Sequence, residues 1–323
     1  MKTTVVALAC TLAAFTARAE QVVVSNYAVT TNGMPFAVAM EKGYFREFKV
    51  NVDGILTSDG GGTTIRNLLG GKLSYGEAAV SAVVSAVQGG ADLKIISGNV
   101  HTVAEFVWVA MPRSPVNSLK DLKGKKLGYT NPRSTSQALA VLLLEKAGYK
   151  PEDAELVKTG GFGPMLAALE LDQIDVAAVT EPLWSKVKDK YRVLVTGAEA
   201  LPPLDNVVGM TTAEAARTRG DFIRAVIRAR RRAVEFMIAN PDEAGDIVAK
   251  PFNITPEVAR SAVRNLTTSF TQGIPYWGTG QIHLAGMKRI IEVQKSVGAI
   301  TGEIDLSKMI DTSFLPDDIK TPK

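Results

Sequence analysis

Short apolar segments alternate with segments of helical periodicity over the first two thirds of the chain. Buried strands read as short apolar runs, whereas helices repeat their apolar positions every three or four residues. Alternation of the two patterns is typical of βαβ units, so we predict an α/β protein with mainly parallel sheets. The expected strands are residues 21–25, 48–55, 73–78, 94–97, 106–111, 126–129, 155–158, 176–179, 191–195 and 206–210, and the expected helices between them are 35–42, 63–69, 80–88, 136–147, 164–169 and 182–187.

Two proline-containing segments divide this pattern into two lobes. The alternation stops at Pro112 and Pro115, starts again, and stops once more at Pro202 and Pro203. Sheets of this kind bind ligands beyond the carboxyl ends of their strands, so two facing lobes would share one cleft. The pattern after residue 210 is almost purely helical, with expected helices at 219–239, 241–249, 256–267 and 280–297. We therefore expect a signal segment at 1–19, a first lobe at 20–111, a second lobe at 112–207 and a return to the first lobe at 208–323.

The first nineteen residues have the pattern of a secretion signal. Lys2 is followed by an apolar run at 5–15, and residues 17–19 (Ala-Arg-Ala) form a small-x-small cleavage site. The run is too short to span a bilayer, so we expect an exported, periplasmic chain that is cut after Ala19. Cys10, the only cysteine, falls inside this segment, and lipidation of Cys10 stays open as an alternative.

Charge and residue chemistry exclude several classes of function. Removal of the signal leaves a net charge of +2, which is too small for a general affinity for nucleic acid. Five arginines at 224–232 alternate with apolar residues at helical spacing, so we interpret them as the solvated face of a helix. The sequence lacks the usual phosphate-binding and nucleophile motifs. With only two histidines and no cysteine in the mature chain, we expect no catalytic residue, metal or cofactor.

A strand–turn–helix segment at 124–148 is the clearest candidate for a binding feature. Its sequence, GKKLGYTNPRSTSQALAVLLLEKAG, places hydroxyl and amide side chains where the helix begins. A helix N-terminus has unpaired N–H groups and a partial positive charge, so it can hold a carboxylate, sulfonate or phosphate. Serine and threonine are also ordinary helix caps that bind nothing. The candidate residues of this anion cradle are Asn131, Arg133, Ser134, Thr135 and Ser136, with Gln137 beside them.

Other polar clusters fall at the ends of expected strands or at the starts of expected helices. Three glycines at 60–62 would allow a ligand to approach the backbone closely, and the two threonines after them stand where a helix cap would be. Most glycine runs are turns, but the common position of the clusters favours one cleft. The candidates in the first lobe are Asn26, Tyr27, Thr31, Asn32, Gly61, Gly62, Thr63, Thr64, Ala79, Ser81, Asn99 and His101, and those in the second lobe beyond the cradle are Gly161, Phe162, Thr180 and Glu181.

The charged and aromatic candidates each have a second interpretation. Glu181 would pair with a ligand ammonium, or it would stabilise the first turn of its own helix. Arg133 would bind an anion, or it would point into solvent. The aromatic side chains that would pack either on a ligand or in the core are Tyr27, Trp108, Phe162 and Trp277.

Several segments, taken in order, carry a family resemblance. They read GYFREFKVNV, DGGGTT, DLKGKKLGYTNPRSTSQALAVLLLEKAGY, IDVAAVTEP and RAVIRARRRAVEFMIANPDEAGDIVAK. In them the chain resembles the periplasmic substrate-binding proteins of the sulfonate, taurine, nitrate and thiamine-precursor group. The resemblance implies a type II periplasmic-binding-protein fold, a clamshell that closes on a small solute and delivers it to an ABC-transporter permease in the inner membrane. It also implies ligand contacts from residues 61–64, 79–81 and 131–137 and from the turn after residue 179.

Together these observations predict a non-catalytic, monomeric solute-binding subunit of an ABC importer. The expected ligand is a small organic anion, such as a sulfonate, a taurine-like molecule or a carboxylate, because Arg133 lies among hydroxyl side chains. The alternatives are a pyrimidine-precursor binding protein, a module that reports to a membrane sensor, and an exported lyase with His101 and Glu181 as acid–base groups.

Overall fold

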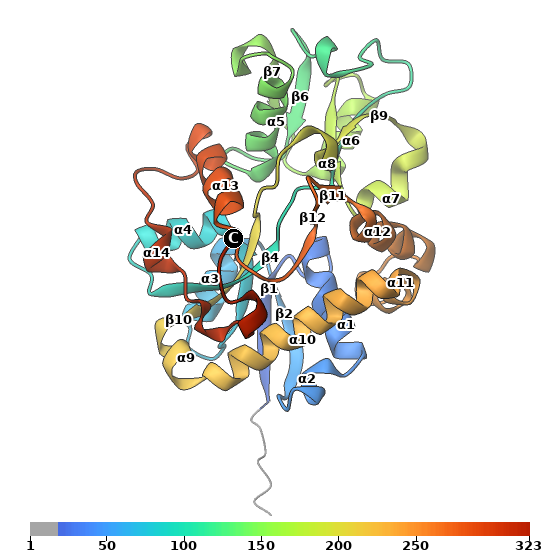
Figure 1. Cartoon of the computed structure of the whole chain (residues 1–323). Helices are drawn as coiled ribbons and strands as arrows, with labels where there is room; N and C mark the ends of the chain where they lie inside the picture. Colours follow the sequence, from blue (N-terminus) through green and yellow to red (C-terminus); the bar gives the residue numbers. More distant parts are fainter. Residues whose placement is uncertain (1–18) are drawn as a thin grey trace, which may run out of the picture.

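The computed structural model describes residues 19–323 as two α/β lobes, one above the other in Figure 1. Residues 1–18 of the expected signal segment, with Cys10 among them, lie outside this range. Between residues 19 and 323, none of the helices combines the length and the apolar character that a membrane crossing needs.

Lobe 1 is built on a six-stranded sheet in the order β13-β4-β10-β3-β1-β2. β1 pairs in parallel with both β2 and β3, as expected for βαβ units. Val22, Val23 and Val24 are all fully buried, which explains the continuous apolar run of β1. The strands are β1 (Glu20–Ser25), β2 (Val52–Ser58), β3 (Gly76–Ala79), β4 (Leu93–Val100), β10 (Val207–Thr212) and β13 (Trp277–Gly280).

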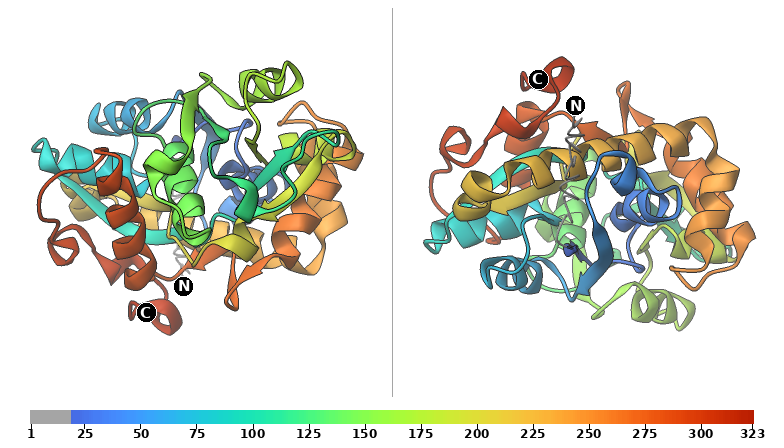
Figure 2. Two further views of the ribbon diagram at one scale, coloured as in Figure 1. Left: turned by 90° about the horizontal axis from the view of Figure 1, so that it is seen from above. Right: turned by 90° about the horizontal axis from the view of Figure 1, so that it is seen from below.

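The expected helices of lobe 1 are present in the expected order, and three short helices at residues 44–47, 213–218 and 306–309 were not predicted. Pro35 lies in the first turn of α1, and Ala79 caps α4 in an extended conformation. The long helix α10 packs on α1 and β13, and the view from below in Figure 2 shows it lying across this lobe. The helices are α1 (Met34–Glu41), α2 (Tyr44–Glu47), α3 (Gly61–Leu69), α4 (Val80–Gln88), α9 (Ala213–Thr218), α10 (Gly220–Ala239), α11 (Pro241–Ala249), α12 (Pro256–Thr268), α13 (Leu284–Ser296) and α14 (Leu306–Met309).

Lobe 2 contains two strand ladders that meet at one bridge. β5 lies between β8 and β9, β6 pairs in parallel with β7, and a parallel bridge from Leu127 to Val176 joins the two ladders. The strands are β5 (Phe106–Ala110), β6 (Lys126–Tyr129), β7 (Glu155–Lys158), β8 (Ala177–Thr180) and β9 (Arg192–Thr196), and the helices are α5 (Thr135–Lys146), α6 (Phe162–Glu170), α7 (Leu183–Val187) and α8 (Gly197–Ala200).

The two strands that cross between lobes differ from our expectation of mainly parallel sheets. β10 enters lobe 1 from lobe 2 and runs antiparallel to β3 and β4, and β5 enters lobe 2 from lobe 1 and runs antiparallel to β8 and β9. Because β5 pairs only within lobe 2, the first crossing lies at residues 101–105 and not near residue 111. Pro112 and Pro115 follow the first strand of lobe 2 and do not mark the crossing.

Some element boundaries also differ from the expected ones. β2 begins at Val52 because Phe48 ends α2, and α13 begins at Leu284 because residues 277–280 form β13. A short hairpin of β11 (Phe270–Thr271) and β12 (Ile274–Pro275) was not predicted, since each of its strands has only two residues.

The C-terminal helices contact both lobes. α12 packs on α7 and α13 packs on α5, although both helices belong to the segment that returns to lobe 1. At the crossings themselves, His101 from the first connection faces Asp205 from the second, with 3.1 Å between Nδ1 and Oδ1. The lobes are therefore joined by two buried connections and by packing of the C-terminal helices.

Candidate ligand-binding site

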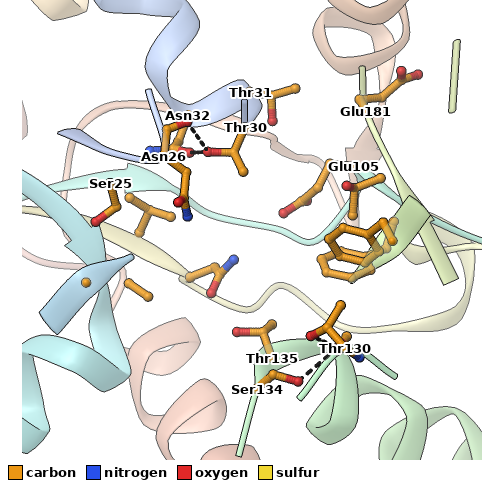
Figure 3. A pocket seen from close by; sticks show the side chains of 18 of the residues that line it. Ser25, Asn26, Thr30, Thr31, Asn32, Glu105, Thr130, Ser134, Thr135 and Glu181 are labelled. Atoms are coloured by element: carbon orange, nitrogen blue, oxygen red, sulfur yellow. Dashed lines mark hydrogen bonds between the residues drawn. The ribbon is translucent and has the colours of Figure 1, made fainter. Parts of the chain in front are cut away.

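A cavity of about 250 Å³ lies between the lobes, where strands end and helices begin (Figure 3). Its size is near the lower end of the range for small-molecule pockets. The residues that line it from lobe 1 are Ser25, Asn26, Thr30, Thr31, Asn32, Gly61, Ala79, Val207 and Tyr276; those from lobe 2 are Phe106, Thr130, Ser134, Thr135, Ser136, Phe162, Thr180 and Glu181; and those from the two connections between the lobes are Glu105 and Asn206.

The start of α5 supplies a row of hydroxyl groups. Ser134 caps the helix by accepting a hydrogen bond from Gln137 N at 3.2 Å. Thr130 N donates to Ser136 Oγ at 3.0 Å, which holds the end of β6 against the first turn of the helix. Figure 3 shows Thr130, Ser134 and Thr135 together on one side of the cavity. The N–H groups of Thr135 and Ser136 in the first turn of α5 have no partner within their own helix, so they can bind an acidic group.

Lobe 1 presents amide and hydroxyl groups that are held by buried partners. Asn32 Nδ2 donates to Glu77 Oε1 at 3.3 Å, and the hydroxyl groups of Thr31 and Tyr276 lie 2.6 Å apart. Glu77 is in turn paired with the buried Arg230, with 3.0 Å between Oε2 and Nε. The orientation of Asn32 in the cavity therefore depends on an ion pair in the core of lobe 1.

Two carboxyl side chains line the cavity. Glu181 accepts hydrogen bonds from Ser185 N and Ser185 Oγ at 3.0 Å and from Asn265 Nδ2 at 2.6 Å. Burial raises the pKa of Glu181, and these hydrogen bonds act in the opposite direction. Glu105 is 7% exposed, and its Oε2 atom is buried without a hydrogen-bond partner among the described residues. Burial raises the pKa of Glu105 to about 8.

The cavity lining contains no lysine, arginine or histidine among the described residues. Arg133 is exposed, and the backbone at this residue has a φ of 63°. Its N–H donates to Gln137 Oε1 at 2.7 Å, so this position belongs to the turn before α5 and not to the cavity wall. The expectation that the Arg133 side chain would bind an anion is therefore not supported, and any anion would rest on helix N–H and hydroxyl groups.

Eleven of the predicted site residues line the cavity, and the other ten lie elsewhere. Thr64 is buried against Ser25 and Ser58, and Thr63 accepts a hydrogen bond from Arg66, so both hydroxyl groups stabilise local structure. Gly62, in the first turn of α3, and Asn131, in the turn before α5, are both exposed. Ser81 and Gly161 are half-buried near the lining residues Ala79 and Phe162 without lining the cavity themselves.

Three further predicted residues have structural roles. Asn99 is buried and donates to Tyr75 Oη at 2.9 Å and to Glu77 Oε2 at 2.5 Å. His101 pairs with Asp205 and lies with its ring centroid 4.3 Å from that of His283, in a different pocket from Glu181. The acid–base pair of the lyase alternative is therefore not assembled. The ring of Tyr27 packs on Phe252, with 5.7 Å between centroids, on the outer side of lobe 1.

The aromatic candidates divide between cavity and core. Phe162 lines the cavity with Phe106, and their ring centroids lie 5.9 Å apart. Trp108 is buried in β5, and Trp277 is buried in β13 with Nε1 donating to Thr31 O at 3.2 Å. Both tryptophans therefore pack in the core.

Eight lining residues were missed by the sequence analysis. Ser25, Thr30 and Thr130 stand next to predicted positions, so a wider window at each strand end would have included them. Glu105 is the one acidic residue in the apolar run from 103 to 111, which is a signal that we did not use. The remaining ones, which only the tertiary fold brings to the cavity, are Phe106, Asn206, Val207 and Tyr276.

The two polar positions before α5 are expected to respond differently to substitution. Ser134→Ala removes the cap and is expected to lower the free energy of unfolding by about 1 kcal/mol. Arg133→Ala is expected to change neither ligand affinity nor this free energy by more than about 0.5 kcal/mol, because the side chain is exposed and outside the cavity. Urea unfolding and ligand titration of both variants provide the test, and a large loss of affinity in Arg133→Ala would return this side chain to the site.

Comparison with known proteins establishes the family. The family model described as NMT1/THI5 like matches residues 30–244. The chain belongs to the NMT1/THI5-like family. Binding proteins from Brucella abortus and Brucella suis are 28% identical to it over 222 residues, which are 66% of this chain and 66% of each relative. The chain thus spans about two thirds of the length of these relatives, and they are named as binding proteins and not as enzymes.

Solved structures show the fold of this NMT1/THI5-like protein. The periplasmic aliphatic sulphonate binding protein SsuA from Escherichia coli superposes with a TM-score of 0.75 at 17% identity, covering 90% of this chain and 91% of SsuA. The periplasmic nitrate-binding protein NrtA from Synechocystis has a TM-score of 0.66 at 14% identity, covering 93% and 87%. The expected α/β periplasmic-binding-protein fold is confirmed.

Proposed function

We propose that this NMT1/THI5-like protein is the periplasmic substrate-binding component of an ABC importer. It captures a small organic solute between its lobes and presents it to a membrane permease. The observation that carries this proposal is the cavity at the lobe interface, which strand ends and helix starts of both lobes line together. The family membership and the sulfonate- and nitrate-binding structural neighbours support it.

We expect the acidic group of the ligand to bind at the start of α5. The hydroxyls of Ser134 and Thr135 and the first turn of this helix offer hydrogen-bond donors to a sulfonate or a carboxylate. Because the described residues of the lining include no basic side chain, these dipoles carry the attraction for the acid. The proposed ligand is a small molecule with an acidic end.

Ligand-induced stabilisation tests the proposal. A solute at 100 times its dissociation constant is expected to raise the free energy of unfolding by about 2.7 kcal/mol. Thermal shifts would be measured with alkanesulfonates, taurine, aliphatic and aromatic carboxylates, nitrate and pyrimidines, and X-ray scattering would follow closure of the lobes.

A blocked variant provides the control for this experiment. Thr135→Trp fills the cavity from the first position of α5, and Lys146→Trp places the same side chain at the exposed end of that helix. We expect the ligand shift to vanish in Thr135→Trp and to persist in Lys146→Trp. The absence of a shift with every compound, together with the absence of a retained ligand in mass spectra of the purified protein, would contradict the proposed function.

A further inference from the structure

Among the described residues that line the cavity, Glu105 has a buried carboxylate oxygen without a hydrogen-bond partner. It lies in the first connection between the lobes, immediately before β5. Its side chain is more than nine-tenths buried, and Oε2 is without a hydrogen-bond partner among the described residues. A buried carboxyl group of this kind costs free energy unless a donor or a positive charge meets it.

Apart from the N–H group of its own backbone, which acts to lower the pKa of Glu105, the surroundings within residues 19–323 do not supply that partner. The other titratable groups of the lining are Glu181 and Tyr276. Glu181 is already satisfied by Ser185 and Asn265, and the Tyr276 hydroxyl pairs with that of Thr31. The core guanidinium behind the lining, Arg230, is bound to Glu77 and to two backbone carbonyl groups.

The opposite side of the cavity has the complementary character. Figure 3 shows the hydroxyl groups of Ser134 and Thr135 separated from the Glu105 side chain by the central space. The start of α5 favours negative charge, whereas the end at Glu105 favours positive charge or a hydrogen-bond donor. One end of the cavity thus favours a negative group and the other a positive group. A molecule with opposite charges at its two ends matches this arrangement.

We propose that Glu105 binds a protonated nitrogen of the captured solute, so that the solute is an amine-bearing acid and not a simple organic anion. This inference rests on the proposed function and names the class of substrate. The carboxylate of Glu105 accepts from the ammonium group, while the acidic group lies at the start of α5. Phe106 and Phe162 cover the apolar middle of the molecule.

Binding of such a solute ionises Glu105. In the free protein, burial raises the pKa of Glu105 to about 8, so most of the population carries the proton at pH 7. An ammonium group in contact favours the carboxylate form and lowers this pKa. Binding at pH 7 is therefore expected to release up to about one proton per protein, and the affinity for the amine-bearing solute is expected to increase from pH 6 to pH 8.

Matched pairs of ligands test the proposal by isothermal titration calorimetry. The pairs are taurine and ethanesulfonate, β-alanine and propionate, and 4-aminobutyrate and butyrate, each titrated in two buffers of different ionisation enthalpy. For the pair that fits, the amine-bearing member is expected to bind about 10- to 100-fold more tightly, because it gains a charged hydrogen bond. Proton release is expected with this member only.

Variants of two carboxyl groups complete the experiment. Glu105→Gln is expected to abolish both the preference for the amine and the proton release, whereas Glu145→Gln, at an exposed position of α5, is expected to retain both. Equal binding of both members, or a preference that survives in Glu105→Gln, would overturn the role of Glu105 and leave the solute-binding function standing. Failure of the wild-type protein to bind either member of any pair, or any compound of the wider panel, would overturn both.

Discussion

Replacing Arg230 with alanine is expected to lower the free energy of unfolding by about 3–5 kcal/mol. Arg230 is 2% exposed, and its guanidinium donates to Glu77 Oε2 at 3.0 Å, to Gly278 O at 2.7 Å and to Asn99 O at 2.9 Å. Its removal leaves the fully buried Glu77 without its positive partner and two carbonyl groups without a donor. Urea unfolding at pH 7 measures the loss.

A neighbouring arginine gives the matched control. Arg228→Ala removes an exposed side chain from the same helix and is expected to change the free energy of unfolding by no more than about 0.5 kcal/mol. The double variant Arg230→Met/Glu77→Gln is expected to recover part of the loss, since it removes both buried charges. Because Glu77 also holds Asn32, the single variant is expected to weaken ligand binding as well. Equal stability of Arg230→Ala and Arg228→Ala would contradict the assigned ion pair.

Substitution of Glu105 is expected to stabilise the ligand-free protein at alkaline pH. The unfolded chain loses the Glu105 proton near pH 4.5, whereas the folded protein keeps it up to about pH 8. Between these values the folded state binds more protons than the unfolded state, so stability falls as the pH rises. The loss accumulates to roughly 4 kcal/mol by pH 8. Glu105→Gln lacks the titrating group and is expected to avoid this loss.

Unfolding curves from pH 4 to pH 9 check this expectation. The wild-type protein and Glu145→Gln are expected to share the decline between pH 4.5 and pH 8, and Glu105→Gln is expected to show a flatter profile. Parallel profiles for all three proteins would show that Glu105 is ionised at no cost in the folded state. A binding-site residue that lowers the stability of the ligand-free protein is an example of the common trade-off between function and stability.

The order of strands and helices was predictable because burial imposes different periods on the two kinds of element. The apolar pattern placed α4 and α11 at their observed bounds and most other elements within a few residues. It could not tell which strands pair, because pairing depends on contacts far apart in sequence. The strand at 106–111 was therefore assigned to lobe 1, although it lies between β8 and β9 in lobe 2.

The arginines of α10 show a signal that was present in the sequence and misread. We interpreted all five as a solvated face, but Arg230 lies four residues after Val226 and four before Val234, both of which are buried. Its position is thus within the apolar stripe, where a charged side chain requires a buried partner. Glu77 is that partner, and it stands in a strand more than 150 residues earlier, so the pair itself could not be read from local pattern.

The polar turns at strand ends identified the region of the cavity but not its chemistry. Hydroxyl residues at the start of α5 were predicted from helix-cap physics, and they line the cavity. Arg133 was predicted to be the anion-binding group, and its position outside the cavity depends on side-chain direction and burial, which the sequence does not contain. Glu105, the acid in the apolar run from 103 to 111, was the better indicator of a binding residue. Burial of an ionisable side chain costs free energy, and packing alone gives no reason for it.

The contact between α12 and α7 changes which parts of the molecule move together. Asn265 of α12 donates to Glu181 of lobe 2 at 2.6 Å, and the hydroxyl oxygens of Ser185 in lobe 2 and Ser261 in α12 lie 3.0 Å apart. Rotation of lobe 2 must either carry α12 along or break these hydrogen bonds. Glu181 also lines the cavity. A solute that binds its carboxylate would therefore weaken the hydrogen bond from Asn265 of α12. Ligand binding in the cleft is therefore expected to change the position of α12 and of the outer surface that the C-terminal helices form.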